Sequence, residues 1–238
     1  LLKALSLTLL IFVFSCNKNL TEEERKAIRA DVYTRGGEEA TDFSDDKIRF
    51  ITERCLKKRV LDLGCVDHHE VNAASRFWLH KAICAVSNDV TGLDYYGPGV
   101  DKLNSQGYSV VHADAQTFKF TEPFDVVVAG DLIEHLPNLE GLFTSVFDAT
   151  VPSGSFVIST PNPWCWKYSM YHLIKGKMTP VNREHVSWFC HQTLENLGKR
   201  FGFKVAAVSF CSRRAWEKLI PIPSRIKHTT LCVEFTKA

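Results

Sequence analysis

Acidic residues and glycines follow apolar runs at several points of the sequence, where strands of a parallel sheet would end. Ligands of open α/β sheets bind beyond the carboxyl ends of the strands. Carboxylates there suit a cofactor that carries hydroxyls, an amino group and a positive charge. A dinucleotide is disfavoured, because no phosphate-binding G-x-G-x-x-G pattern follows Gly64. The strand-end candidates are Asp62, Gly64, Cys65, Asp94, Tyr95, Asp114, Gly130 and Asp131, and then Thr160, Pro161 and Asn162.

Histidines supply the candidates for proton transfer, because imidazole titrates near neutral pH. His135 follows the fourth apolar run, and His185 lies in Arg183-Glu184-His185. Each also has a structural interpretation: His135 can cap a helix, and His185 can line a pocket for the acceptor. Adjacent His68 and His69 would point apart on an extended segment. With no spaced third ligand beside them, the sequence predicts no metal site.

Alternating strand and helix patterns predict the scaffold that positions these residues. Helical spacing of apolar residues predicts helices near 44–56, 75–85, 100–106, 139–147 and 194–201. Short apolar runs predict strands at 60–63, 89–93, 108–112, 124–129, 156–159, 205–210 and 229–235. Such alternation predicts a doubly wound, mostly parallel seven-stranded α/β sheet with an antiparallel edge pair. Residues 160–189 are expected to be a long irregular stretch.

The order of the motifs resembles that of class I S-adenosylmethionine-dependent methyltransferases, which implies their Rossmann-like fold. The resemblance covers roughly residues 40–238. Residues 184–189, ahead of a helix and Gly202, are similar to the tail of small-molecule members, including the ubiquinone-biosynthesis O-methyltransferase group. The matching motifs are Val60-Leu61-Asp62-Leu63-Gly64-Cys65, Gly92-Leu93-Asp94, His112-Ala113-Asp114-Ala115 and the run from Phe124 to Leu136.

The resemblance implies S-adenosylmethionine as the cofactor and a role for each strand end. Gly64 would let the backbone approach the methionine part, whose amino group Asp62 would bind. By the same resemblance, Asp94 would bind both ribose hydroxyls of the cofactor, and Asp114 with Ala115 would bind its adenine. Gly130 and Asp131 would line the boundary between the cofactor and the acceptor.

Two departures from the family pattern concern the loop after Gly64. Val66 and His68 stand where family glycines often stand, and a Cβ there narrows the approach to the cofactor. Asp94 also lies 32 residues after Asp62, against roughly 20 in related nucleotide-binding folds. We expect a loop rebuilt around the same cofactor.

Residues 163–183 interleave tryptophan, tyrosine and histidine with lysine and arginine. One interpretation is a lid, within 160–189, that stacks a sugar or aromatic acceptor. Another is a peripheral membrane contact through 163–177, and a third is ordinary loop packing. A nucleic-acid partner is disfavoured, because the formal net charge is only +2.

The 238 residues, 45% hydrophobic and 24% charged, suit one globular domain with an appendage. Residues 1–19 form an apolar leader or a misassigned N-terminus, with membrane contact through 1–15 as an alternative. Residues 20–57 are expected to form N-terminal helices, and 58–238 the methyltransferase domain. Eight scattered cysteines without a C-x-x-C pair predict free thiols in the cytoplasm.

The sequence therefore predicts an enzyme that moves a methyl group to a small-molecule or glycan acceptor, with O-methylation favoured. One alternative is a non-catalytic binding protein of the same fold that has lost cofactor affinity. A nicotinamide oxidoreductase is disfavoured by the missing glycine loop. An exported lipoprotein, acylated at Cys16, is suggested by the leader alone. The oligomeric state is not indicated.

Overall fold

A computed structural model describes residues 46–66, 78–176, 182–211 and 221–238. The expectations for the leader, the first polar helix and His68 with His69 lie outside the described residues. No helix within the described ranges is long and apolar enough to cross a membrane.

Seven strands form one sheet in the order β3-β2-β1-β4-β5-β7-β6. Strands β1 to β5 pair in parallel, whereas β7 is antiparallel to both β5 and β6. This order confirms the predicted doubly wound sheet with its antiparallel edge pair. The strands are β1 (Arg59–Leu63), β2 (Asp89–Asp94), β3 (Val110–His112), β4 (Phe124–Gly130), β5 (Thr150–Pro161), β6 (Phe203–Cys211) and β7 (Thr230–Lys237).

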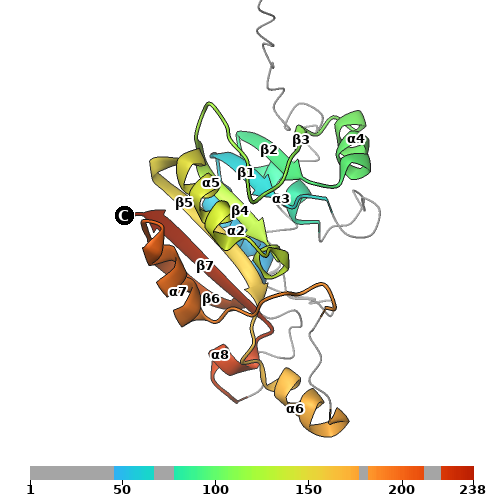
Figure 1. The fold of residues 1–238 in the computed structure, drawn as a ribbon, viewed down its shortest axis with the longest axis vertical. Coiled ribbons are helices and arrows are strands. Elements are labelled where there is room, and N and C mark those ends of the chain that lie inside the picture. The colour runs from blue at the N-terminus through green and yellow to red at the C-terminus, as the bar shows by residue number, and fades with distance from the viewer. Residues whose placement is uncertain (1–45, 67–77, 177–181, 212–220) are drawn as a thin grey trace, which may run out of the picture.

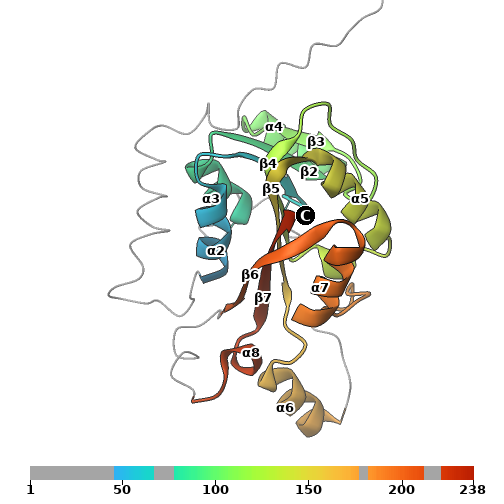
Figure 2. The ribbon, with the colours of Figure 1, turned by 90° about the vertical axis from the view of Figure 1, so that its left-hand side faces the viewer.

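Helices cover both faces of the sheet. Figure 2 shows α2 and α3 on one side and α5 and α7 on the other. Helices α6 and α8 lie beyond the end of the sheet at which β5 finishes (Figure 1). The helices are α2 (Asp46–Cys55), α3 (Leu79–Val86), α4 (Gly97–Ser105), α5 (Leu139–Ala149), α6 (Trp166–Lys175), α7 (His191–Arg200) and α8 (Ser224–Lys227), with the 3-10 turn η2 (Ile133–His135).

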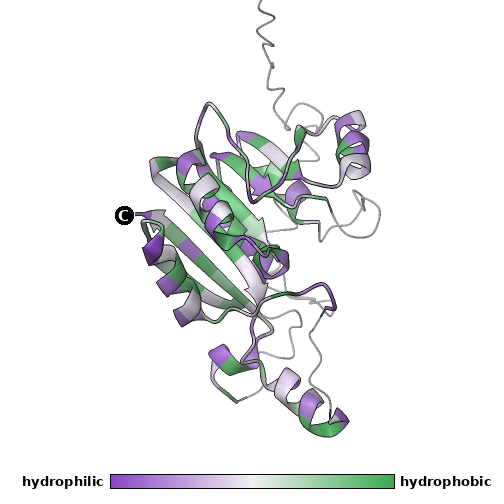
Figure 3. Ribbon diagram, in the orientation of Figure 1, coloured by the Kyte–Doolittle hydropathy of each residue, from purple (hydrophilic) through white to green (hydrophobic). Residues whose placement is uncertain are grey.

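The central strand β4 is apolar along nearly its whole length because helices cover both faces of the sheet there. Val127 and Val128 of β4 face opposite sides of the sheet, and both are fully buried. They belong to different core clusters, one packed under α5 and the other under α2 and α3. Figure 3 shows the same division, with hydrophobic residues along the central strands and hydrophilic residues on the outer helix surfaces.

A cluster of phenylalanines joins α5 to the antiparallel end of the sheet. The Phe143 ring lies edge-on to Phe156, Phe203 and Phe235, at centroid distances of 5.5, 6.2 and 6.3 Å. Such edge-to-face pairs are favourable beyond the area that they bury. This packing holds the antiparallel strands β7 and β6 and the neighbouring strand β5 against α5.

Gly198 of α7 packs directly against this cluster. A Cβ at Gly198 would lie 2.5 Å from Cε1 of Phe235, so Gly198→Ala must displace the ring. Overpacking of this kind costs about 1–3 kcal/mol, and the better helix propensity of alanine offsets about 1 kcal/mol of it. We expect a net loss of about 1 kcal/mol, the middle of the resulting range, in the free energy of unfolding measured by urea denaturation. Gln192→Ala, an exposed change on α7, is the matched control; equal stability of the two variants would contradict the prediction.

Two predicted elements differ from the structure. The strand predicted at 156–159 begins earlier, at Thr150, so that Pro152, Ser153 and Gly154 lie inside β5, whose register with β4 shifts between Phe124 and Val126. The stretch 160–189 was expected to be irregular, yet it contains α6. No residue of α6 is buried, so the helix leaves no apolar stripe in the sequence to reveal it.

The expectation of free thiols holds for part of the chain. Cys84 is disulfide-bonded, which contradicts the prediction at that position. The free cysteines of the described residues are Cys55, Cys65, Cys165, Cys190, Cys211 and Cys232. Cys55 is buried on the apolar face of α2 with Ile48 and Ile51, in the helix predicted near 44–56, whereas Leu56 is exposed just beyond the helix.

Candidate active site

The predicted strand-end residues lie at one edge of the sheet. Asp62 of β1 pairs in register with Gly92 of β2 and Val128 of β4, so the ends of these three strands are neighbours. Asp94 ends β2 and Gly130 ends β4. The parallel topology therefore brings carboxylates from distant parts of the sequence to the same edge of the sheet, which is where ligands of open α/β sheets bind.

Asp94 is buried and binds two backbone amides. Its Oδ2 accepts a hydrogen bond from Val66 N at 2.9 Å, and its Oδ1 accepts one from Tyr96 N at 2.9 Å. Burial raises the pKa of the Asp94 carboxyl above its ordinary value, and these amides oppose that effect. Each oxygen keeps a further acceptor position, so the oriented carboxylate suits a vicinal diol such as a ribose.

Asp62 is buried with a partner that the sequence analysis missed. His80 Nδ1 of α3 lies 2.8 Å from Asp62 Oδ2. This contact leaves Oδ1 of Asp62 as the oxygen for an amino group. The partner could not be recognised from spacing, because His80 lies 18 residues further along the chain.

The backbone carbonyl of Cys65 makes a hydrogen bond in the loop after β1, whereas its thiol is buried. Its carbonyl oxygen accepts a hydrogen bond from Trp78 Nε1 at 2.9 Å. Its side chain is buried against Gly92, where an added Cβ would lie 2.6 Å from Sγ. Burial, followed by the nearby Asp62 and Asp94, raises the pKa of the Cys65 thiol well above its usual value, so the thiol stays neutral.

The loop after β1 begins with a turn that requires glycine. Gly64 has a φ of +70°, in the region that side chains rarely adopt, and its N–H donates to Leu93 O at 2.8 Å. Val66, which replaces a family glycine, packs toward α4. A Cβ at Gly99 would lie 2.5 Å from Cγ1 of Val66, so this glycine makes room for the valine.

Gly64→Ala should destabilise the protein through this turn. The left-handed conformation costs a non-glycine residue about 1–2 kcal/mol, and the new Cβ would lie 3.0 Å from Cδ1 of Leu132. Gly176→Ala is the matched control, since Gly176 has a φ of +62° and a Cβ added there would meet no atom within 4 Å. We expect a larger loss of unfolding free energy for Gly64→Ala than for the control. An equal loss would contradict the crowding against Leu132.

The candidates after β2 and β3 are more exposed. The Tyr95 side chain is 76% exposed, and its carbonyl oxygen lies 2.9 Å from His112 Nε2. Asp114 Oδ1 accepts a hydrogen bond from Gln116 N at 2.8 Å, which is the local turn contact that aspartate favours. Ala115 is buried within the main core cluster. The roles expected of these residues in cofactor binding stay predictions, and the contacts shown for Asp114 are local.

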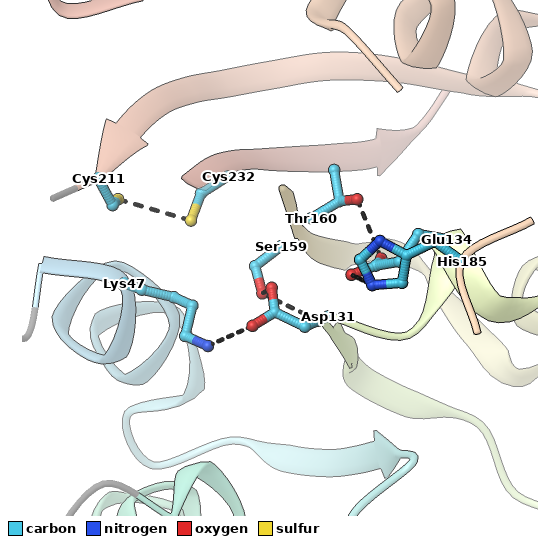
Figure 4. Close-up of polar contacts among 8 residues, drawn as sticks. All are labelled: Lys47, Asp131, Glu134, Ser159, Thr160, His185, Cys211 and Cys232. Atoms are coloured by element: carbon cyan, nitrogen blue, oxygen red, sulfur yellow. Dashed lines mark hydrogen bonds and ion pairs between the residues drawn. The ribbon is translucent and has the colours of Figure 1, made fainter. Parts of the chain in front are cut away.

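Asp131 follows β4 in a strained conformation held by two elements. Its φ is +50°, and its N–H donates to the Ser159 carbonyl oxygen at 2.9 Å. Its Oδ1 accepts from Ser159 Oγ at 3.0 Å, and its Oδ2 lies 2.7 Å from Lys47 Nζ of α2 (Figure 4). Gly130, just before it, packs so closely that a Cβ would lie 2.5 Å from Leu79 Cδ2. Positive-φ residues of this kind cluster at functional sites.

Glu134 is the residue of this region that the sequence analysis missed. It is 1% exposed, and its Oε2 accepts from Thr160 Oγ1 of β5 at 2.9 Å. Its Oε1 has no hydrogen-bond partner among the described residues. Burial, and after it the charge of Asp131, raises the pKa of Glu134 to about 8. The spacing of Asp131, Glu134 and His135 on one turn was the available signal.

The two candidate histidines lie together against Glu134. The rings of His135 and His185 are 4.7 Å apart and nearly perpendicular. His185 Nε2 lies 4.0 Å from Glu134 Oε1 (Figure 4). The Glu134 carbonyl oxygen accepts hydrogen bonds from Val186 N and Ser187 N, at 2.9 and 3.2 Å. These backbone contacts fasten the His185 segment to η2 and form an imidazole cluster beside the β4 end.

Residues 37–208 match the protein family described as "Methyltransferase domain". The chain belongs to this family. A protein of Mycolicibacterium smegmatis named "Probable S-adenosylmethionine-dependent methyltransferase" is 26% identical over 158 residues, which cover 65% of this chain and 55% of that protein. The (S)-coclaurine N-methyltransferase of Thalictrum flavum is 26% identical over 113 residues, covering 48% of this chain and 30% of the other. The chain thus spans about half or less of these curated relatives.

The fold of this methyltransferase domain agrees with solved structures. An S-adenosylmethionine-dependent methyltransferase from Mesorhizobium loti superposes with a TM-score of 0.55 at 21% identity, covering 80% of this chain and 96% of that one. The superposition confirms the expected fold, whereas the expected family and its cofactor class are confirmed by the family match and the named relative. The glycine turn at Gly64 and the oriented carboxylate of Asp94 fit S-adenosylmethionine, whose ribose and charged methionine part need these two features.

Proposed function

We propose that the protein transfers the methyl group of S-adenosylmethionine to a hydroxyl oxygen of a small-molecule or glycan acceptor. The observation that carries the proposal is the imidazole cluster of His135 and His185 against Glu134, one turn after Asp131. A hydroxyl must lose its proton during methylation, and an imidazole near the acceptor can take it. Asp94 and Gly64 would hold the cofactor on the adjoining strands.

The reaction forms a carbon–oxygen bond and breaks a carbon–sulfur bond. The acceptor oxygen supplies the electron pair to the methyl carbon, and the pair of the broken bond stays on sulfur as S-adenosylhomocysteine forms. The hydroxyl proton passes to His185 or His135 and then to solvent. Alignment of the two reactants supplies about 7–11 kcal/mol of the barrier reduction in such reactions.

The acceptor would lie between the imidazole cluster and α6, which we propose as the lid. Tyr168 of α6 contacts Trp188 edge-on, at a centroid distance of 5.7 Å, and Trp188 in turn lies 6.3 Å from His185. This aromatic series leads from α6 to the imidazole cluster and suits stacking on a sugar or an aromatic ring. The outward face of α6, where Leu173 and Ile174 are exposed, leaves a peripheral membrane contact as the alternative role.

N-methylation is the second candidate function. It is favoured by the similarity to a protein named as an (S)-coclaurine N-methyltransferase. An amine that reaches the site uncharged needs no strong base, so the imidazole cluster would matter less than for a hydroxyl. The two functions therefore differ in their dependence on His185.

A methyl-transfer assay with trideuteromethyl-labelled cofactor tests the proposal. The full chain is incubated with separate panels of phenols, sugars and amines, and labelled products are identified by mass spectrometry. We expect labelled ethers from the phenol or sugar panel. Labelled amines alone would favour the second function. Calorimetric titration with S-adenosylmethionine and S-adenosylhomocysteine comes first, because failure of a folded protein to bind either would favour a non-catalytic relative.

A further inference from the structure

Among the described residues, Glu134, His135 and His185 offer one ligand atom each within 4.8 Å of one another. We propose that these three side chains bind a first-row divalent cation such as Mn²⁺, Co²⁺ or Zn²⁺. The site would lie on the acceptor side of the proposed reaction, so its catalytic role rests on the proposed function. The existence of the metal site does not depend on the proposed function. The sequence analysis predicted no metal, because it weighed only His68 and His69.

The state of the Glu134 carboxylate points to a missing partner. One oxygen is held by Thr160, while the other, Oε1, is buried with no hydrogen-bond partner in the described part of the chain. A buried polar atom without a partner costs about 1–3 kcal/mol, and more when it is charged. This oxygen lies 4.0 Å from His185 Nε2 (Figure 4), and His135 offers a third ligand atom nearby, so a cation held among the three would compensate its burial.

The distances suit a shared ion better than a direct contact. At 4.0 Å, Glu134 Oε1 and His185 Nε2 are too far apart for a hydrogen bond. Nitrogen and oxygen ligands lie about 2.0–2.2 Å from such an ion, so two of them on one ion are ~3.0–4.3 Å apart. All three ligand atoms lie within 4.8 Å of one another, so rotation of an imidazole that moves its nitrogen by a few tenths of an ångström would bring the widest pair into this range.

The ligand types select the class of metal. Two imidazoles and one carboxylate suit first-row transition ions, whereas Mg²⁺ and Ca²⁺ prefer oxygen ligands. Three protein ligands also leave positions open, which is typical of catalytic rather than structural sites. With an ion bound, the imidazoles would act as ligands and not as proton acceptors. An acceptor hydroxyl bound to the ion would then release its proton to solvent, because a bound cation lowers the pKa of a coordinated oxygen.

The surroundings hold the ligands in place before an ion arrives. Thr160 Oγ1 donates a hydrogen bond to Oε2 of Glu134 at 2.9 Å, which orients the carboxylate through the oxygen that does not serve as the ligand. The amides of Val186 and Ser187 bind the Glu134 carbonyl oxygen, so the two ligand-bearing segments cannot separate without breaking them. Supporting hydrogen bonds of this kind are typical of metal sites and raise their affinity.

Titration of the full chain with Co²⁺ tests the site without cofactor or acceptor. Metal is first removed with a chelator, and binding is followed by the visible absorption of cobalt. We expect one saturable site of micromolar affinity, from which Zn²⁺ displaces the cobalt. Glu134→Gln and His185→Gln should each weaken binding by about 100-fold or more, because each removes a ligand rather than a supporting residue. His191→Gln, on α7, is the matched control and should bind as the wild type does.

A second measurement uses the unmodified protein, in case a variant does not fold. Proton NMR of the cobalt-loaded chain should show paramagnetically shifted imidazole N–H signals from two of the nine histidines. Absence of saturable binding would overturn the proposal, as would binding that survives both ligand substitutions in folded variants. Either result leaves the methyl-transfer assay unaffected, so failure of the metal site and failure of the proposed function are distinguishable.

Discussion

Replacing Asp94 with alanine is expected to weaken S-adenosylmethionine binding by at least about 100-fold. A hydrogen bond to a charged group contributes about 1.5–3 kcal/mol, and the carboxylate can accept one from each ribose hydroxyl. The substitution also releases the amides of Val66 and Tyr96, which Asp94 now holds. Calorimetric titration of the variant with S-adenosylmethionine measures the effect.

The control for this variant removes the same charge from the same region. Asp101 lies on α4, close in sequence to Asp94, and is exposed. Asp101→Ala should bind the cofactor as tightly as the wild-type chain. Undiminished affinity in a folded Asp94→Ala variant would remove Asp94 from the cofactor site.

His185→Ala should lower kcat by about 10²–10⁴-fold, which is the usual contribution of a positioned acid or base. Its imidazole lies against Glu134, away from the Asp94 carboxylate that would bind the cofactor. The KM for S-adenosylmethionine should therefore change little. Steady-state kinetics with a hydroxyl acceptor separates the two parameters.

His191→Ala provides the comparison for this second variant. His191 is half-buried at the start of α7, where its contact is an ion pair with Glu195 at 3.7 Å. It should leave both kcat and KM unchanged. A His185→Ala enzyme with wild-type kcat would exclude His185 from the reaction and would favour an acceptor that needs no base, such as an amine.

A helix or strand could be predicted from the sequence where its own apolar residues form a regular pattern. The unbroken apolar run of β4 and the regular apolar spacing of α5 identify these elements without any knowledge of their partners. Helix α6 could not be recognised in this way, since it packs with no buried face. Strand β5 continues through Pro152 and Gly154, residues that normally end a strand, because the register shift with β4 accommodates them.

The sequence could predict those site residues whose position follows from the order and direction of the strands. Asp62, Asp94 and Asp131 could be assigned to one edge because parallel strands end there. Their partners could not be assigned: Lys47 meets Asp131 across 84 residues of sequence, and Thr160 meets Glu134 across 26. Such pairs arise from the packing of separate elements, and Glu134 gains its unusual pKa only through that packing.

The position of β7 in the sheet has a consequence for the order of folding. β6 is joined to the sheet through β7, which lies between it and β5. During synthesis β6 leaves the ribosome before β7, so it has no neighbour to pair with until residues 230–237 have followed. Until then β5 exposes an open edge that includes Ser159, which pairs with Cys232. A nascent chain arrested before β7 should thus depend on chaperones to prevent association through that edge.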